Sequence, residues 1–138
     1  MIAGWCSSCT HYKRQLVRRA ETLRNLGMLI VVIELQTKTV GQPADTAIAY
    51  AHAKALTDPP PWIVAGDLDT VLANSPDEGQ GFIRRSGFVT LYPTLIVVRT
   101  RDMNLIVDGS PNGSWAGRTL PLEQIARDPE KLWLPGPF

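Results

Sequence analysis

The stretch from Gly4 to Tyr12, GWCSSCTHY, holds both cysteines of the chain and leads directly into a long helical pattern. Cys6 and Cys9 are three residues apart, and positions i and i+3 share one face of a helix. Their sulfurs can therefore form a disulfide at the helix N-terminus. The unpaired N–H groups and the dipole at that end favour a thiolate and lower the pKa of Cys6. The spacing predicts a site of dithiol/disulfide exchange.

The composition indicates one domain over residues 1–138, of which residues 128–138 form a C-terminal tail. A hydrophobic share of 44% is enough for a core, so the fold does not need a disulfide between the cysteines for its stability. A net charge of +1 gives no electrostatic case for nucleic acid or an anionic membrane as a partner.

The longest apolar run, Met28 to Ile33, is far shorter than the roughly 20 residues of a helix that spans a membrane. We see no signal peptide, and the compartment, bacterial periplasmic or cytoplasmic, stays open.

After the motif, the periodicity predicts a helix from about Ser8 to Leu26, which Gly27 ends in the left-handed conformation. The apolar stripe of this helix consists of Cys9, Tyr12, Leu16, Ala20 and Leu23. The basic residues lie largely off the stripe, and we expect them on a solvated face, with a docking patch for an acidic partner as the alternative. They are Lys13, Arg14, Arg18, Arg19 and Arg24.

The next segments predict alternating strands and helices. Residues 28–35 are apolar and β-branched, as in a parallel strand buried on both faces. Pro43 or Asp45 opens a helix to Leu56. We expect its packed side to hold Ala44, Ile48, Ala51, His52 and Ala55. The prolines of residues 58–61 form a rigid connector to a short strand at residues 62–65.

The second half predicts a closing hairpin and helix. Between residues 68 and 91 we expect loops and a short helix near Val71 or at residues 82–85. Residues 94–99 and 104–107 read as an antiparallel pair, residues 108–117 as a loop and residues 120–127 as a helix. The whole order predicts an α/β fold with a central mixed β-sheet flanked by helices.

Two separated features together resemble the thioredoxin superfamily. One is the Trp-Cys-x-x-Cys motif at residues 5–9 opening a helix, and the other is Tyr92-Pro93-Thr94 opening a buried strand. More narrowly, the chain resembles the redoxin branch related to alkyl hydroperoxide reductase/thiol-specific antioxidant (AhpC/TSA) and cytochrome-biogenesis thiol reductases. The resemblance implies a thioredoxin-like fold and a thiol-disulfide oxidoreductase. Such an enzyme acts on protein thiols or disulfides and exchanges electrons with a donor or acceptor protein, without a metal or other cofactor.

The resemblance also implies a role for individual residues. Cys6 would be the exposed nucleophile and Cys9 the buried resolving thiol. Trp5 would cover the site, and Tyr92 would lend backbone to a bound substrate strand. Pro93 would be a cis proline facing the disulfide.

Three departures from the family limit what the resemblance implies. Ala3 stands where a peroxiredoxin has Thr or Ser, so we do not expect peroxidase activity. Ser7-Ser8 lies between the cysteines in place of the family's dipeptides, so the direction of electron flow stays open. In the family, the strand before the first cysteine lies between two other strands of the sheet, which correspond here to residues 28–35 and 94–99. In this chain the strand before Cys6 spans at most Met1 to Gly4. We expect this first strand to be truncated, the alternatives being a short strand that suffices or a strand supplied by a partner.

Two other functions remain open at this stage. A thioredoxin-like fold can act as a binding or structural module with a passive Cys6–Cys9 disulfide. Cys-x-x-Cys is also half of a zinc site, which His11 and His52 could complete. We expect His11 instead to be an exposed polar residue and His52 a packing or exposed one.

Overall fold

The fold is described here from a computed structural model, for residues 1–67, 92–109, 113–115, 118–131 and 133. Within these ranges the chain is mixed α/β, with one small parallel sheet, one antiparallel hairpin and three helices. The helix expected near Val71 or at residues 82–85 lies outside the described residues.

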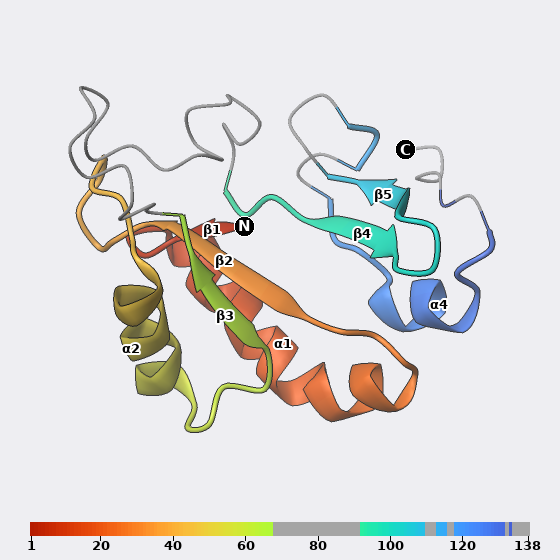
Figure 1. The fold of residues 1–138 in the computed structure, drawn as a ribbon, viewed down its shortest axis with the longest axis horizontal. Helices are drawn as coiled ribbons and strands as arrows, with labels where there is room; N and C mark the ends of the chain where they lie inside the picture. The colour runs from red at the N-terminus through yellow and green to blue at the C-terminus, as the bar shows by residue number, and fades with distance from the viewer. Residues whose placement is uncertain (68–91, 110–112, 116–117, 132, 134–138) are drawn as a thin grey trace.

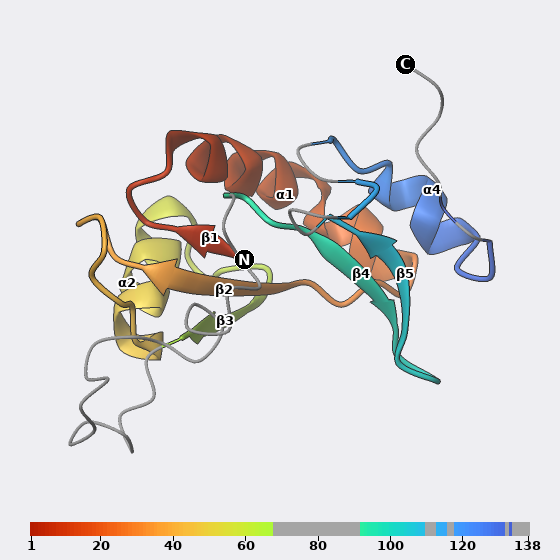
Figure 2. The same cartoon turned by 90° about the horizontal axis from the view of Figure 1, so that it is seen from above.

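Three parallel strands form the first sheet, in the order β1 (Ile2–Ala3), β2 (Val31–Gln36) and β3 (Ile63–Gly66). α1 (Ser7–Asn25) connects β1 to β2 and lies along one face of the sheet (Figures 1 and 2). α2 (Thr46–Leu56) connects β2 to β3 and packs against both of them. The sheet therefore fixes the end of β1 close to the start of α1, where both cysteines lie.

α1 begins and ends as its sequence predicts. Leu16, Ala20 and Leu23 are buried along one stripe. Gly27 has a φ of 82°, and its N–H donates to the carbonyl of Arg24, while the N–H of Met28 donates to that of Leu23. This pattern satisfies the free carbonyls at the end of the helix and needs glycine's conformational freedom.

The solvated face expected for the basic residues of α1 is correct for Arg14, Arg18 and Arg24 but wrong for Lys13 and Arg19. Lys13 is buried beside the apolar stripe. Arg19 forms an ion pair with Glu123 of α4 (Leu122–Arg127), which packs against α1. Helical periodicity indicates which face of a helix is polar but not which neighbouring element covers that face. It therefore could not show that Lys13 and Arg19 would be covered while the other basic residues stay exposed.

The packed side expected for α2 is correct for Ala44, which is buried, and for Ile48 and His52, which are half-buried, but wrong for Ala51 and Ala55, which are exposed. Ala49 and Ala53 are buried instead. The helix is rich in alanine on every side, so hydrophobicity alone does not determine which side faces the sheet. Its start is as expected, because the carboxylate of Asp45 accepts the N–H of Ile48 at 2.7 Å.

The second half of the described chain forms a hairpin of β4 (Ile96–Arg99) and β5 (Asn104–Asp108), which pair antiparallel. The predicted central mixed sheet is therefore divided into two sheets. Met1 joins the two sheets through two hydrogen bonds to Thr94. Its amino group donates to the carbonyl of Thr94 at 2.8 Å, and its carbonyl accepts the N–H of Thr94 at 3.0 Å. β1 thus lies between β2 and the entry to β4, as expected, but it is too short to complete a single ladder.

Candidate functional site

Cys6 is the residue that caps α1. Its backbone is extended, with φ −81° and ψ 111°, and its sulfur accepts the N–H of Cys9 at 3.1 Å. The two cysteines form a disulfide, with their Cα atoms 5.3 Å apart. The sulfur of Cys6 therefore lies at the positive end of the helix dipole and directly on one of its free N–H groups.

The expectation that Cys6 is exposed is wrong for this disulfide form of the protein. Cys6 is 5% exposed and Cys9 is completely buried. Both belong to the hydrophobic cluster that also contains Ile2, Ala3 and Leu16. Because β1 brings Cys6 into the sheet's apolar layer, only an edge of this residue reaches the surface. Cys9 is more deeply buried than Cys6, as we expected for the two cysteines.

Trp5, which directly precedes Cys6, is in contact with Tyr92. Their rings pack edge to face, with centroids 5.7 Å apart, and Trp5 is 41% exposed. Such an arrangement is favoured by the quadrupoles of the two rings. Trp5 therefore presents an aromatic surface to solvent next to the cysteines, while its other edge is held by the protein.

The residue that holds Trp5 and Tyr92 is Gln36, which was not predicted as a site residue. The side-chain oxygen of Gln36 accepts the indole N–H of Trp5 at 2.8 Å and the backbone N–H of Gly41 at 2.8 Å. Its amide nitrogen donates to the hydroxyl of Tyr92 at 3.2 Å. An amide at the end of a mainly apolar strand, two residues after Glu34, is the signal in the sequence that could have identified it.

Pro93 follows a cis peptide bond from Tyr92, which confirms the conformation expected for it. Both residues line a cavity of about 740 Å³ at the start of α1. Ser7 and Ser8, the pair between the cysteines, contribute to the same cavity, as do Trp115 and Arg118. The structure thus brings Ser7 and Ser8 together with Tyr92 and Pro93 at one cavity, while Trp5 contacts Tyr92 and the two cysteines lie buried at the start of the same helix.

Charged side chains are buried behind this region. Glu34 of β2 is 2% exposed and lies 2.5 Å from the ring nitrogen Nδ1 of His52. Burial lowers the pKa of Lys13, while the nearby charge of Glu34 opposes that shift. Glu34 also reaches Gly4, because a Cβ at Gly4 would lie 2.8 Å from its Oε1. Glu34 therefore connects α1, α2 and the backbone that leads into Trp5 and Cys6.

The histidines proposed as zinc ligands have other partners. His11 is exposed and lies 2.8 Å from the side chain of Gln15, while His52 binds Glu34. Over the described ranges, no group of three or more His, Cys, Asp or Glu side chains is placed to hold a metal ion. The same part of the chain contains no helix long and apolar enough to cross a membrane.

Comparison of this chain with protein-family models, with curated proteins and with solved structures finds no match.

Proposed function

We propose that this protein is a thioredoxin-like thiol-disulfide oxidoreductase of the redoxin type. In the reducing direction, the thiolate of Cys6 attacks a substrate disulfide, forms a mixed disulfide with one sulfur and releases the other as a thiolate. The thiolate of Cys9 then attacks Cys6, which releases the second substrate thiolate and leaves the Cys6–Cys9 disulfide. The two electrons and two protons gained by the substrate come from the dithiol, which a donor protein must regenerate. The reverse sequence oxidises a substrate dithiol.

The observation that carries this proposal is the position of the Cys6 sulfur on the N–H of Cys9 at the helix N-terminus. A thiolate formed there keeps this hydrogen bond and the favourable dipole, whereas the sulfur of Cys9 lies inside the hydrophobic cluster. The cavity lined by Ser7, Ser8, Tyr92 and Pro93 is where we expect the substrate segment to lie. Trp5 would cover one side of it.

The assigned roles are tested by alkylating the reduced protein with a limiting amount of iodoacetamide and mapping the label. We expect Cys6 to react at least about tenfold faster than Cys9, because it has both the thiolate-stabilising position and the greater exposure. Equal rates, or a faster Cys9, would contradict the roles. Cys9→Ser should accumulate a mixed disulfide with the substrate, and Cys6→Ser is the matched control that should not.

A passive disulfide in a binding module is the second candidate, and it is favoured by the burial of Cys6, which is only 5% exposed. Insulin reduction with dithiothreitol separates the two. The oxidoreductase should accelerate insulin precipitation in a manner that depends on Cys6, with Cys6→Ser at the background rate. A folded wild-type protein that gives only the background rate would favour the passive module.

A further inference from the structure

The exposed face of α1 carries a row of polar side chains that starts at the cavity beside the disulfide. The row is formed by exposed residues at intervals of four, three and four, which are Ser7, His11, Arg14 and Arg18. Residues at these intervals share one face of a helix. Ser7 and His11 line the cavity of about 740 Å³. Arg14 and Arg18 follow along the helix axis, away from the cysteines, so a polypeptide whose sulfur lies in the cavity can extend over both.

The charges of Arg14 and Arg18 are unopposed. Residues 1–20 contain no Asp or Glu, and the first carboxylate of the sequence is that of Glu21. Within the part of the chain that the structure describes, neither guanidinium forms an ion pair or a hydrogen bond, whereas their neighbour Arg19 is paired with a carboxylate of α4. The exposed face of α1 next to the cavity therefore attracts anionic groups.

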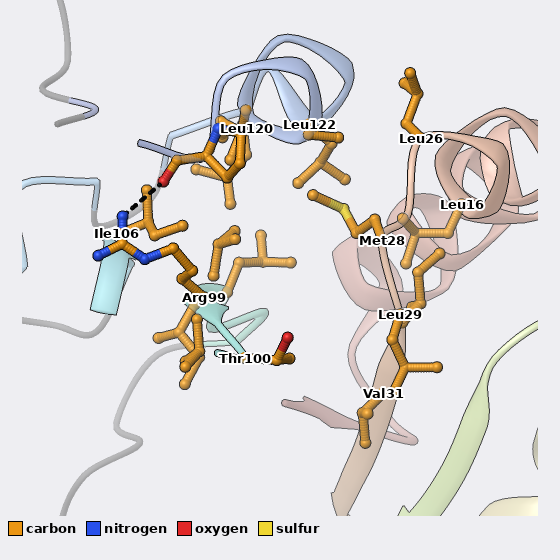
Figure 3. Close-up of a pocket in the computed structure, with 18 of the residues that line it drawn as sticks. Leu16, Leu26, Met28, Leu29, Val31, Arg99, Thr100, Ile106, Leu120 and Leu122 are labelled. Atoms are coloured by element: carbon orange, nitrogen blue, oxygen red, sulfur yellow. Dashed lines mark hydrogen bonds between the residues drawn. The ribbon is translucent and has the colours of Figure 1, made fainter. Parts of the chain in front are cut away.

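The cavity beside the disulfide has the same sign of charge as this helix face. Arg118 lines it, and none of the described residues that line it is Asp or Glu. Another cavity, of about 580 Å³, lies between β2 and β4 and is lined mainly by apolar side chains such as Leu16 and Leu122 (Figure 3). Positive charge therefore distinguishes the cavity at the cysteines from the apolar one.

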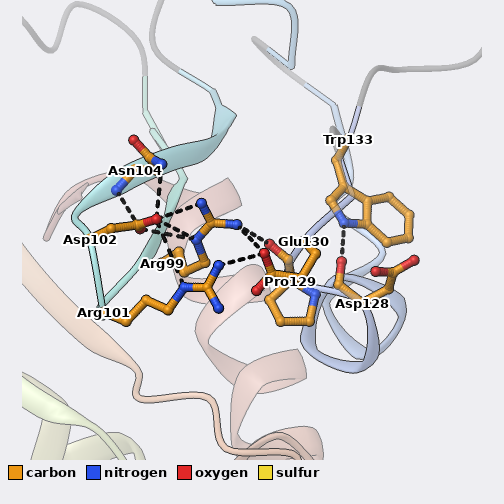
Figure 4. A network of polar contacts seen from close by, with 8 residues as sticks. All are labelled: Arg99, Arg101, Asp102, Asn104, Asp128, Pro129, Glu130 and Trp133. Carbon is orange, nitrogen blue, oxygen red and sulfur yellow. Dashed lines mark hydrogen bonds and ion pairs between the residues drawn. The ribbon is translucent and has the colours of Figure 1, made fainter.

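The basic side chains of the hairpin are neutralised, in contrast to the exposed arginines of α1. Arg99 contacts Asp102 at 2.6 Å and Glu130 at 2.8 Å (Figure 4). Arg101 contacts the same Glu130 carboxylate at 2.6 Å. An incoming carboxylate would have to displace these partners at the hairpin, but it meets no such competitor among the described residues on the exposed face of α1.

The spacing along α1 sets where carboxylates must lie in a partner. A helix rises about 1.5 Å per residue, so Arg14 and Arg18 lie about 10 Å and about 16 Å beyond Ser7 along its axis. An extended peptide advances about 3.3 Å per residue. A peptide that lies along α1 with its cysteine at Ser7 therefore brings its third and fifth residues from that cysteine to the two arginines.

We propose that the exposed face of α1 binds an acidic segment of the substrate protein, with carboxylates about three and five residues from the reacting cysteine paired with Arg14 and Arg18. The proposal rests on the thiol-disulfide exchange proposed above, since the row starts at the cavity where that exchange is expected. Guanidinium–carboxylate pairs add charge-assisted hydrogen bonds, and unopposed positive charge raises the rate of encounter with an anionic partner. The arginines recognise the substrate and take no part in the transfer of electrons.

The test uses the whole chain, reduced beforehand, and peptides whose only cysteine is joined by a disulfide to a neutral thiopyridyl group. The Cys6–Cys9 dithiol gives two electrons and two protons to this disulfide, which releases pyridinethione and the peptide thiol and leaves the Cys6–Cys9 disulfide. One peptide has glutamates at the third and fifth positions after the cysteine, another has them before it, and the matched controls have glutamine there. At low ionic strength one acidic peptide should react about tenfold faster than its glutamine control, and this ratio should fall toward one in concentrated salt.

Two variants locate the binding surface. Arg14→Gln combined with Arg18→Gln should lower the ratio of the acidic to the glutamine rate to about two or less. The ratio cancels any effect of the substitutions on the cysteines themselves. Arg24→Gln is the matched control, because Arg24 is also exposed but lies on a different face of α1, and it should leave the ratio unchanged.

The rates with the glutamine peptides report the exchange chemistry alone. If the folded protein reduces none of the peptides, the exchange chemistry is wrong and the acidic recognition falls with it. If it reduces acidic and glutamine peptides at equal rates, or if the ratio survives the double variant, only the acidic recognition is overturned. An equal drop of the ratio in Arg24→Gln would also overturn it, because net charge and not the position of Arg14 and Arg18 would then be responsible.

Discussion

The indole nitrogen of Trp5 lies 2.8 Å from the side-chain oxygen of Gln36, 31 residues further along the chain. Through its nitrogen the same amide reaches the hydroxyl of Tyr92 at 3.2 Å. One buried side chain at the end of β2 therefore orients both aromatic residues beside the disulfide. Gln36 touches neither cysteine in these contacts, so its role is to position the residues around them.

Replacing Gln36 by Leu should lower the rate of insulin reduction roughly fivefold and the free energy of unfolding by about 3 kcal/mol, since its side chain makes three hydrogen bonds and each contributes about 1 kcal/mol. Trp5→Phe keeps a ring for Tyr92 but removes the indole N–H that donates to Gln36. The double variant should lose less than the sum of the single losses, because both remove one interaction. Strictly additive effects on turnover and on urea unfolding would show that the hydrogen bond does not act as described.

Gly4→Ala should destabilise the protein by about 2–3 kcal/mol, as expected for overpacking. The added Cβ would lie 2.8 Å from Glu34 Oε1, 2.8 Å from the backbone carbon of Thr37 and 2.9 Å from the nitrogen of Lys38. Gly27→Ala is the control, because its Cβ meets nothing within 4 Å and only its φ of 82° is strained. That variant should lose about 1 kcal/mol. Thermal unfolding of both variants measures the two losses in stability. Equal losses would show that the close contacts of the added Cβ at Gly4 are not the cause.

His52→Leu should cost about 3 kcal/mol, because it leaves the buried Glu34 carboxylate without its hydrogen-bonding partner. Glu34→Gln combined with His52→Leu should recover part of this loss, since the uncompensated charge is gone. Guanidinium unfolding of the single and double variants measures the difference. A double variant less stable than His52→Leu alone would mean that the charge of Glu34 has another compensating partner.

The ion-pair network at the hairpin predicts how the stability of the folded protein changes with pH. Arg99 donates to Asp102 and lowers the pKa of that carboxyl from 3.8 to about 2 in the folded protein. The carboxylate therefore favours the folded state above pH 3.8, and this contribution is lost as the pH falls through about 2. Carbon-detected NMR titration of the Asp102 carboxyl should show the low midpoint. In Arg99→Gln the midpoint should move back toward 3.8, and an unchanged midpoint would exclude Arg99 as the cause.

Local features of the fold were predictable from the sequence because a few neighbouring residues determine them. Gly27 ends α1 and Asp45 caps α2, each through hydrogen bonds within a few residues. The Cys6–Cys9 disulfide follows from the i, i+3 spacing at the start of a helix.

The features that sequence reasoning missed depend on contacts between distant segments. Lys13 is buried although it lies off the apolar stripe of α1, and Gln36 joins the site because Tyr92, fifty-six residues later in the chain, accepts its hydrogen bond. The division into two sheets depends on how far β1 extends along β2, which a hydrophobic pattern of two residues cannot define. No local periodicity encodes these relationships.

The pair of hydrogen bonds between Met1 and Thr94 has a consequence for biosynthesis. A chain made from its N-terminus can assemble β1, β2 and β3 once Gly66 has left the ribosome, because these strands use only the first half of the sequence. The link to the hairpin spans 93 residues and forms only after Thr94 has emerged. The parallel unit, with both cysteines, can therefore form before the hairpin, and it would then have an open strand edge of the kind that chaperones protect during translation.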